Sequence, residues 1–504
     1  MESIEHITDN DVDSALLREI PLAFARNNRL VPLKRDGDVL RGAVSDTAGI
    51  LALSEVAKRY GLKAHPLKAS PDLITEALNR LYGQLGSAEE VMGNISGEDL
   101  TSVATEFEKP RDILELTEEA PIIRLLNALF QQAVKDRASD IHIEPYEREL
   151  EVRTRVDGIL HRVLSPPKIV QEALISRVKI MAKLDIAEKR LPQDGRIRLL
   201  IGGRDIDVRV SVVPTTFGER AVLRLLDRGQ GALGLGEIGM EAGTRPRFEE
   251  LLTRTNGIIL VTGPTGSGKT TTLYAALQKV YTEAKNIITV EDPVEYQLKG
   301  IGQIQVNPRI GLTFASGLRS ILRQDPDVIM VGEIRDFETA EIAVQASLTG
   351  HLVLSTLHTN DSSSALTRLI DMGVEPFLIS SSLVAVLAQR LVRTLCSHCR
   401  EGHRASETEK ALAGEDVAEL YKARGCDSCR GTGYHGRTGI YELLTVDDAV
   451  RQMITTRQNA QTIKEYAVSR GLRTLFDDGI EKVRCGLTTI EEVLRVTQQD
   501  YAEI

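Results

Sequence analysis

The sequence predicts an α/β protein of several domains, and three observations lead to this prediction. First, 504 residues are too many for one ordinary core, because domains usually hold about 100 to 200 residues. Second, from about residue 236 onward, short continuous apolar strands alternate with helical patterns, which is typical of a parallel sheet covered on both faces. Third, the octapeptide at 263–270 (GPTGSGKT) fits a phosphate-binding loop that joins one such strand to a helix.

Composition and charge exclude several classes of protein. Hydrophobic residues make up 42% of the chain and charged residues 27%, as in ordinary globular proteins. The uncharged stretch 377–389 is well short of the roughly 20 apolar residues of a membrane-spanning helix, and the N-terminus lacks a signal peptide pattern. A net charge of -10, no Trp and 4% aromatic residues argue against nucleic acid as a partner. We therefore expect a cytoplasmic protein whose membrane role depends on a protein partner.

Patterning along the chain divides it into four segments. Residues 1–83 alternate short helical and strand-like stretches, as in a small α/β module, and the polar, acidic stretch 84–110 has the composition of a flexible linker. A second α/β domain is expected over 111–230. The fourth segment, 231–504, contains the phosphate loop and, at 394–434, four cysteines.

Within the second domain, hydrophobic periodicity predicts a helix at 122–130 and half-buried strands at 150–156 and 206–212. Asp157-Gly158 and Gly202-Gly203 are turn signals next to these strands. The second face of the last strand is polar, and the ordinary explanation is a solvated face. A functional role of that face stays open because arginines stand at 196, 198, 204, 209, 220 and 224.

The phosphate loop has the residues that its chemistry needs. The apolar run 258–262 predicts the strand before it, and residues 270–277 carry apolar side chains at helical spacing. Its glycines let backbone N–H groups surround phosphate oxygens, and the helix N-terminus adds a positive dipole end. Lys269 is expected to reach the β and γ phosphates and Thr270 to bind Mg²⁺. We therefore expect ATP and Mg²⁺ at Gly263, Pro264, Thr265, Gly266, Ser267, Gly268, Lys269, Thr270 and Thr271.

Polar residues also follow the strands predicted at 287–291, 328–331 and 352–356. Ligands of open α/β sheets bind at such carboxyl ends. Glu295 follows the first strand and Glu333 the second, and carboxylates of this kind hold Mg²⁺ and orient water in phosphoryl transfer. The sequence leaves open which of the two is the general base, and whether any carboxylate touches the metal directly.

Two histidines bracket the last of these strands. His351 precedes it and His358 follows it, so the strand-end rule places His358 nearer the phosphates. Gly332 stands where P-loop ATPases usually carry an Asp.

With these motifs in place, most of the chain resembles the secretion ATPases of bacterial type II secretion and type IV pilus assembly. Residues 288–295 (ITVEDPVE) are similar to the family's aspartate box, 322–336 (LRQDPDVIMVGEIRD) to its acidic-strand motif, and 348–360 (LTGHLVLSTLHTN) to its histidine box. Gly before the motif Glu is usual in that family. The resemblance implies a RecA-like ATPase core, preceded by a PAS-like α/β domain and a small N-terminal module, that works as a homohexamer.

The resemblance also implies that arginines approach the nucleotide, some of them from the preceding domain. A guanidinium stabilises charge that develops on phosphate, and an arginine supplied across an interface makes hydrolysis depend on assembly. Arg209, Arg224 and Arg335 match catalytic positions, and Arg319, Arg323 and Arg368 match binding positions.

Four of the five cysteines form two C-x-x-C pairs, CSHC at 396–399 and CDSC at 426–429. In a reducing cytosol this spacing indicates tetrahedral zinc, whereas a redox pair would need no second copy. With Cys396, Cys399, Cys426 and Cys429 all bound, no position is left for water, so we expect a structural Zn²⁺. Cys485 stands apart and is expected in the core.

The four cysteines and the chain length resemble the type II secretion branch of the family. The branch implies an ATP-hydrolysing hexameric motor that powers pseudopilus assembly and protein export across the outer membrane. It also implies attachment to the inner membrane, through docking of residues 1–83 on the cytoplasmic domain of an inner-membrane secretion protein, and action on an inner-membrane platform protein. Type IV pilus assembly is the alternative within the family. A conjugation-type nucleic-acid translocase is the alternative of another class, which the acidity disfavours.

Overall fold

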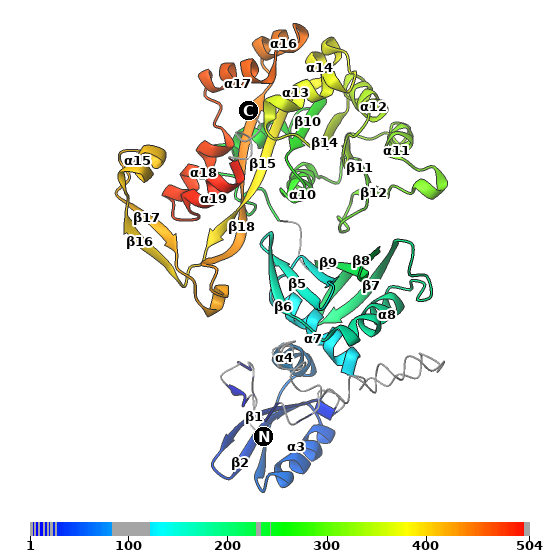
Figure 1. Cartoon of the computed structure of the whole chain (residues 1–504), viewed down its shortest axis with the longest axis vertical. Helices are drawn as coiled ribbons and strands as arrows, with labels where there is room; N and C mark the ends of the chain where they lie inside the picture. Colours follow the sequence, from blue (N-terminus) through cyan, green and yellow to red (C-terminus); the bar gives the residue numbers. More distant parts are fainter. Residues whose placement is uncertain are drawn as a thin grey trace. The chain divides into compact units, whose positions relative to one another are not determined.

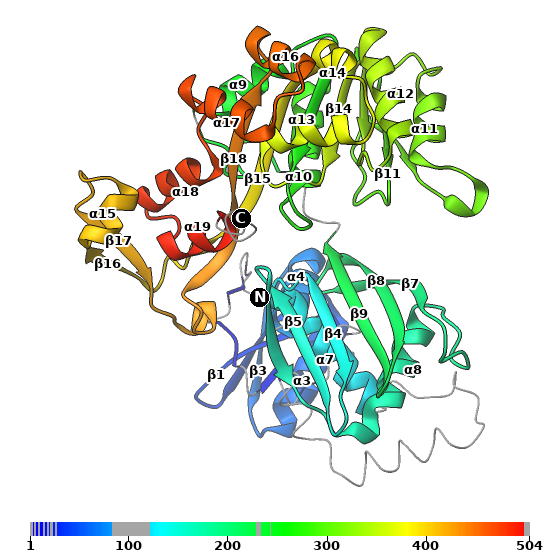
Figure 2. The same ribbon diagram turned by 45° about the horizontal axis from the view of Figure 1, so that its top comes forward.

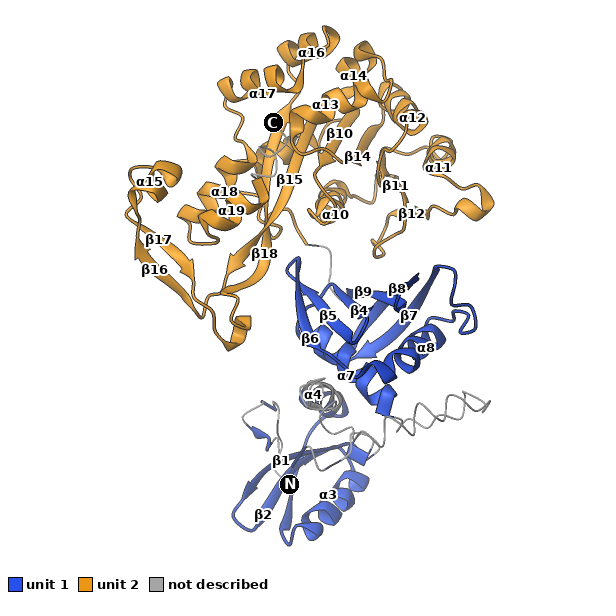
Figure 3. Cartoon of the chain, viewed as in Figure 1, with its two compact units in different colours: residues 1–230 blue, residues 231–504 orange. Residues whose placement is uncertain are grey.

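The computed structural model describes residues 28–82, 121–227, 233–241 and 243–497, together with isolated positions between 4 and 25. The chain divides into two compact units, Met1–Gln230 and Gly231–Ile504 (Figure 3). The linker predicted at 84–110 lies outside the described residues. The finer division into four segments therefore remains a prediction.

The N-terminal part of the first unit is a small α/β module. Its three strands lie in the order β1-β2-β3, and the helix α3 connects the parallel pair β2 and β3. Asp46 caps that helix, because its carboxylate accepts a hydrogen bond of 3.0 Å from the N–H of Gly49. The elements are β1 (Leu30–Asp36), β2 (Val39–Val44), α3 (Thr47–Arg59), β3 (Lys63–Lys68) and α4 (Pro71–Tyr82).

Residues 121–227 form an antiparallel six-stranded sheet with two helices, and the strand order is β6-β5-β4-β9-β8-β7. Ile206, Val208 and Val210 of β8 are buried in one core with α7 and α8, as the alternation predicts. Asp157 and Gly158, both at positive φ, turn the chain from β5 into β6. The elements are α7 (Pro121–Lys135), β4 (Asp140–Pro145), β5 (Leu150–Val156), β6 (Ile159–Leu164), η3 (Lys168–Val170), α8 (Gln171–Met181), β7 (Gln193–Ile201), β8 (Arg204–Thr215) and β9 (Gly218–Asp227).

The second unit is built on a seven-stranded sheet with the order β12-β11-β13-β14-β10-β15-β18. The pairs are parallel except for the last, β15 with β18, which is antiparallel. Strands β13, β14 and β10 are neighbours in this order, so their carboxyl ends meet at one edge. The strands are β10 (Gly257–Thr262), β11 (Ile287–Glu291), β12 (Gly302–Gln305), β13 (Val328–Val331), β14 (Leu352–Leu357), β15 (Leu383–Leu395) and β18 (Tyr434–Thr445).

Different helices cover the two faces of this sheet. Ile258 and Leu260 of β10 belong to a core shared with α11, α12, α13 and α14, whereas Ile259 and Val261 belong to a core shared with α9 and α10. Coverage on both faces explains why the strands are apolar at successive positions. The helices are α9 (Arg245–Leu251), α10 (Lys269–Val280), η4 (Pro308–Ile310), α11 (Phe314–Ile321), α12 (Phe337–Leu348), α13 (Ser362–Asp371) and α14 (Pro376–Ser382).

The pair β15 and β18 continues beyond the sheet as a long two-stranded ribbon, with partners from Ala385 and Thr445 to Leu395 and Tyr434. In Figures 1 and 2 this ribbon leads to the extension that contains β16 and β17. The remaining elements are β16 (Arg400–Arg404), α15 (Glu407–Ala413), β17 (Glu419–Ala423), η5 (Asp427–Cys429), α16 (Asp448–Thr455), α17 (Ala460–Ser469), α18 (Leu475–Arg484) and α19 (Ile490–Thr497). Among the described residues, we find no helix whose length and apolar content would let it cross a membrane.

Candidate functional site

The loop at 263–270 connects β10 to α10, with Lys269 as the first residue of the helix. Gly263, Gly266 and Gly268 all lie at positive φ. A Cβ on Gly263 would stand 2.4 Å from the carbonyl oxygen of Gln389, so only glycine fits there. A Cβ on Gly266 would meet nothing within 4 Å, so the chain approaches open space at this glycine. The loop is therefore tight on its inner side and open on its outer side.

Lys269 donates hydrogen bonds of 2.7 Å to the carbonyl of Gly263 and 3.0 Å to that of Pro264. Its half-buried position lowers the pKa of the ammonium group to about 8, although the nearby Glu333 carboxylate favours the charged form. Both carbonyls belong to the loop itself, so the ammonium group is held over the loop. Thr270 follows in the first turn of α10 and is exposed.

Glu333 follows β13 after Gly332, and its mostly buried carboxylate faces a guanidinium group and an imidazole ring. Its Oε1 lies 2.5 Å from Nη2 of Arg335, and its Oε2 lies 3.3 Å from Nε2 of His358. The hydrogen bond to Glu333 raises the pKa of Arg335. The ends of β13 and β14 are tied together, since Thr356 donates 2.7 Å to the carbonyl of Gly332. Glu333, His358 and Lys269 are thus assembled at one edge of the sheet.

The segment after β11 separates its acidic residues. Glu291, the last residue of the strand, is buried and accepts hydrogen bonds from Thr289 at 2.5 Å and from Gln303 at 3.1 Å. Asp292 is exposed and Glu295 is partly exposed. Only the last two of these three carboxylates can therefore meet a ligand from solution.

The two histidines around β14 lie at opposite ends of the strand. The Nδ1 atom of His351 lies 2.8 Å from the carbonyl of Ala346, at the amino end. His358 lies at the carboxyl end, beside Glu333. The strand-end rule predicts this difference.

Sequence reasoning missed the residues that support the loop from neighbouring strands. Thr272 of α10 donates 2.7 Å to the side chain of Gln389 on β15, and Thr262 lies 2.7 Å from the hydroxyl of Thr359. Tyr274, buried on α10, donates to Glu291. These partners are far apart in sequence, so only the strand order brings them together.

The arginines of the second unit lie on three segments. Arg319 on α11 contacts Glu338 at 2.6 Å, and Arg323 donates 2.9 Å to the carbonyl of Arg319. Arg368 is exposed on α13. Of these three and Arg335, Arg335 is the one that contacts a predicted catalytic carboxylate, Glu333.

In the first unit, Arg209 on β8 is the cross-strand partner of Arg224 on β9 and of Arg196 on β7. Arg224 pairs with the buried Asp140 at 3.0 Å. The arginines therefore form a row on the face of the sheet opposite the core, partly neutralised by carboxylates.

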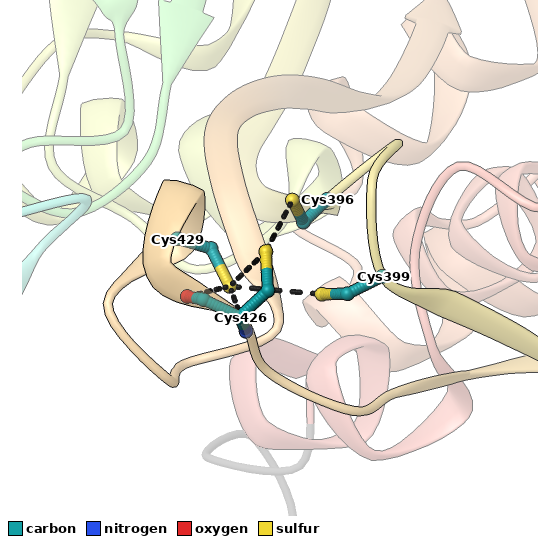
Figure 4. A group of neighbouring side chains, drawn as sticks. All are labelled: Cys396, Cys399, Cys426 and Cys429. Carbon is teal, nitrogen blue, oxygen red and sulfur yellow. Dashed lines mark hydrogen bonds between the residues drawn. The ribbon is translucent and has the colours of Figure 1, made fainter.

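The four cysteines of the extension converge, as Figure 4 shows. Their sulfur atoms all lie within 4.8 Å of one another, with Sγ to Sγ distances of 3.9 Å for Cys396 and Cys426, and 3.7 Å both for Cys399 and Cys429 and for Cys426 and Cys429. A tetrahedral zinc ion with bonds of about 2.3 Å separates its sulfurs by about 3.8 Å, so this arrangement fits the ion.

The environment of Cys429 also suits a metal-binding thiolate. Burial opposes ionisation, but the N–H groups of Cys426 and Gly433 each donate 3.1 Å to its sulfur and help lower the pKa of the thiol to about 6. No disulfide joins the described cysteines. Cys485 is exposed at the end of α18, so the prediction that it lies in the core was wrong. Its position in sequence gave no sign of this exposure.

Comparisons with known proteins agree with this geometry. The family of type II/IV secretion system proteins matches residues 115–495, and the MshEN domain matches residues 3–88. Type II secretion system protein E of Pseudomonas aeruginosa is 51% identical over 96% of this chain and 97% of its own length. Type II secretion system ATPase E of Vibrio cholerae is 50% identical over 96% of this chain and 97% of its own length. The type IV pilus assembly ATPase PilB of Myxococcus xanthus is 44% identical over 98% of this chain and 89% of its own length.

Solved structures support the fold of the second unit and of the domain before it. The pilus retraction motor PilT with bound ADP is 27% identical and superimposes with a TM-score of 0.51, over 74% of this chain and 96% of its own. The ATPase DotB of Legionella pneumophila superimposes with a TM-score of 0.56 at 21% identity, over 78% of this chain and 98% of its own. At this identity the likeness shows the fold alone. The predicted RecA-like architecture is confirmed.

Proposed function

The chain belongs to the type II/IV secretion system protein family, and we propose that it is the ATP-hydrolysing motor of a type II secretion system. The observation that supports this proposal best is the assembly of Lys269, Glu333 and His358 beside the phosphate loop at one edge of the sheet. The pilus assembly relative is less similar than the two type II secretion relatives, so secretion is the preferred role.

In this proposal the loop residues 263–271 bind the phosphates of ATP, and the ammonium group of Lys269 leaves the loop carbonyls for the β and γ phosphates. A Mg²⁺ ion bound with the nucleotide would neutralise charge on the phosphate oxygens, with Thr270 among its ligands. Glu333 and Glu295 are the two candidates for orienting the attacking water. His358, beside Glu333, can respond to the state of that carboxylate.

The arginines belong to the same proposal. Arg335, next to Glu333, would stabilise charge that develops on the γ phosphate, and Arg319, Arg323 and Arg368 would bind nucleotide. We keep the expectation from the family that Arg209 and Arg224 act in an assembled homohexamer.

For the four cysteines we propose a structural Zn²⁺. The sulfur separations fit a tetrahedral ion, and four protein ligands leave no open position for a substrate. Bound zinc would supply cross-linking rather than chemistry, holding the two C-x-x-C turns together. The partners and location proposed are those of the family: residues 1–83 dock on the cytoplasmic domain of an inner-membrane secretion protein, the chain acts on an inner-membrane platform protein, and no nucleic acid takes part.

Phosphate release by the purified protein tests the enzymatic part of the proposal. The wild-type chain should release phosphate from ATP with Mg²⁺, and the Glu333→Gln variant should lose most of that activity. A wild-type chain that binds ATP but releases no phosphate in any assembly state would contradict the motor function.

A further inference from the structure

A buried polar cluster lies behind the phosphate loop, between α10 and the strands β11 and β12. We call Tyr274, Thr289, Glu291 and Gln303 the Tyr274 cluster. Tyr274 and Thr289 are fully buried and Glu291 is nearly so. Thr289 and Glu291 lie within the 288–295 motif, whereas Tyr274 and Gln303 were not singled out by any motif that predicts the site.

The carboxylate of Glu291 is held at both oxygens. Thr289 and Gln303 donate to Oε1 at 2.5 and 3.1 Å, and the hydroxyl of Tyr274 donates to Oε2. Burial and the Glu291 charge raise the pKa of Tyr274 well above its usual value, so the phenol keeps its proton. Glu291 is therefore an internal anchor and has no free oxygen for a ligand.

The cluster also holds the backbone of the segment that follows β11. The hydroxyl oxygen of Tyr274 accepts a hydrogen bond of 3.3 Å from the N–H of Glu295, and the amide oxygen of Gln303 accepts one of 2.7 Å from the N–H of Leu298. The amide nitrogen of Gln303 donates 3.2 Å to the carbonyl of Tyr296. Three backbone groups of this segment, at Glu295, Tyr296 and Leu298, are thus held by two side chains.

Tyr274 connects this segment to the phosphate loop through one rigid element. It lies on α10 one turn after Thr270, and α10 begins at Lys269. Apolar side chains of the same volume would fill this space without leaving polar atoms to satisfy. What the polar cluster adds is directional hydrogen bonding to the N–H of Glu295.

We propose that Tyr274 is a positioning residue, which sets the place of Glu295 relative to the phosphates through the N–H of Glu295. The inference rests on the proposed ATPase function and deepens it, because it assigns to Glu295 a role in the hydrolytic step that depends on Tyr274. Catalytic groups must be held closely, and a displacement of about 1 Å can cost about 100-fold in rate.

The Tyr274→Phe variant tests this, because it keeps the ring and removes only the hydroxyl. We expect kcat for phosphate release to fall about tenfold or more while KM and nucleotide affinity change less than about twofold. Tyr281→Phe is the matched control, since it removes a hydroxyl at the end of the same helix that lies beside Gly300 and makes no hydrogen bond with the four residues of the Tyr274 cluster. Its kcat should equal that of the wild type.

A double-mutant cycle separates positioning from general support. If Tyr274 acts through Glu295, then Tyr274→Phe should lower kcat no further in a Glu295→Gln background. Independent multiplication of the two effects, or full activity in Glu295→Gln alone, would overturn the inference. A thermal unfolding curve and ADP titration of each variant show that the fold and binding persist.

The outcomes also distinguish the inference from its premise. If the wild type hydrolyses ATP and Tyr274→Phe has the same kcat, the inference is overturned and the proposed function stands. A wild-type protein that releases no phosphate overturns the proposed function and the inference with it.

Discussion

The carboxyl-end edge of the large sheet and the four-cysteine turns both gather potential ligands, but they differ in how those groups are satisfied. At the sheet edge, Lys269 is half-buried and bonded to loop carbonyls, and Glu333 is shared between Arg335 and His358. In the extension, four sulfurs face one another, and backbone N–H groups already donate to Cys429.

This difference separates chemistry from architecture. Groups that exchange one partner for another stay partly exposed and are held by provisional contacts, as Lys269 is. Groups that hold a structural ion surround it on all sides, as the cysteines would surround the proposed zinc. The two regions should therefore respond to mutation independently, and the following predictions test that independence from the largest effect to the smallest.

The Lys269→Ala variant should abolish ATP hydrolysis, with a loss of about 100-fold or more, because the charge aimed at the transferring phosphate is gone. Phosphate release is the measurement, and metal content should stay as in the wild type. Lys279→Ala is the control, since Lys279 lies on the same helix and pairs at the surface with Glu249 at 2.8 Å. Hydrolysis that survives in Lys269→Ala would break the assignment of the sheet edge.

The Cys429→Ser variant should reduce zinc from about one ion per chain to a small fraction, because an incomplete set of thiolates binds weakly. Elemental analysis measures this, and limited proteolysis should show new cleavage within 394–434. Nucleotide affinity should remain. Cys485→Ser provides the matched control, being an exposed cysteine outside the cluster. Zinc retained in full by Cys429→Ser would refute the metal site.

Nucleotide affinity should decrease as pH rises through about 8. The pKa of Lys269 is lowered to about 8 by burial, while bound phosphates favour the charged ammonium group. In the nucleotide-free protein, the buried charge of Lys269 lowers the free energy of unfolding at pH values below 8. This destabilisation disappears as the pH rises from 8 toward about 10.4, the pKa of lysine in the unfolded chain.

Titration with fluorescent ADP between pH 7 and 9 measures the effect, which is at most about tenfold per pH unit above 8. The Lys269→Arg variant retains its charge over this range, so its affinity should change less. A wild-type affinity that stays constant up to pH 9 would contradict the proposed environment of Lys269.

The Ser406→Ala variant should have the smallest effect, about 1 kcal/mol of local stability in α15. Ser406 and Glu409 form a capping box. The N–H of Glu409 donates a hydrogen bond of 3.3 Å to the Ser406 hydroxyl, and the N–H of Ser406 donates one of 2.8 Å to the Glu409 carboxylate. Hydrogen exchange of the α15 amides measures the loss, with the exposed Thr408→Ala as control. A fall in ATPase activity would show that the two regions are not independent.

Much of the sheet edge could be predicted from sequence because its motifs are local. The phosphate loop is contiguous, and Glu333 and His358 each follow a recognisable apolar strand, so the strand-end rule places them. The same holds for the cysteines, whose C-x-x-C spacing is itself a geometric constraint.

The supporting contacts could not be predicted in this way. Gln389 meets Thr272, and Tyr274 meets Glu291, only because β15 and β11 take particular places in the sheet. Hydrophobic periodicity identifies strands but carries no information on their order. The prediction that Cys485 is buried failed for a related reason, because a single residue at the end of a helix has no periodic pattern that indicates its exposure.

The ribbon of β15 and β18 gives the two regions a common mechanical element. Gln389, beside the phosphate loop, and Cys396, at the four-cysteine turn, stand seven residues apart along one chain segment, a span of about 23 Å at strand spacing. Two paired strands over this distance bend less than a single unpaired segment would. A tilt of these paired strands at the loop would therefore displace the four cysteines in proportion to that distance.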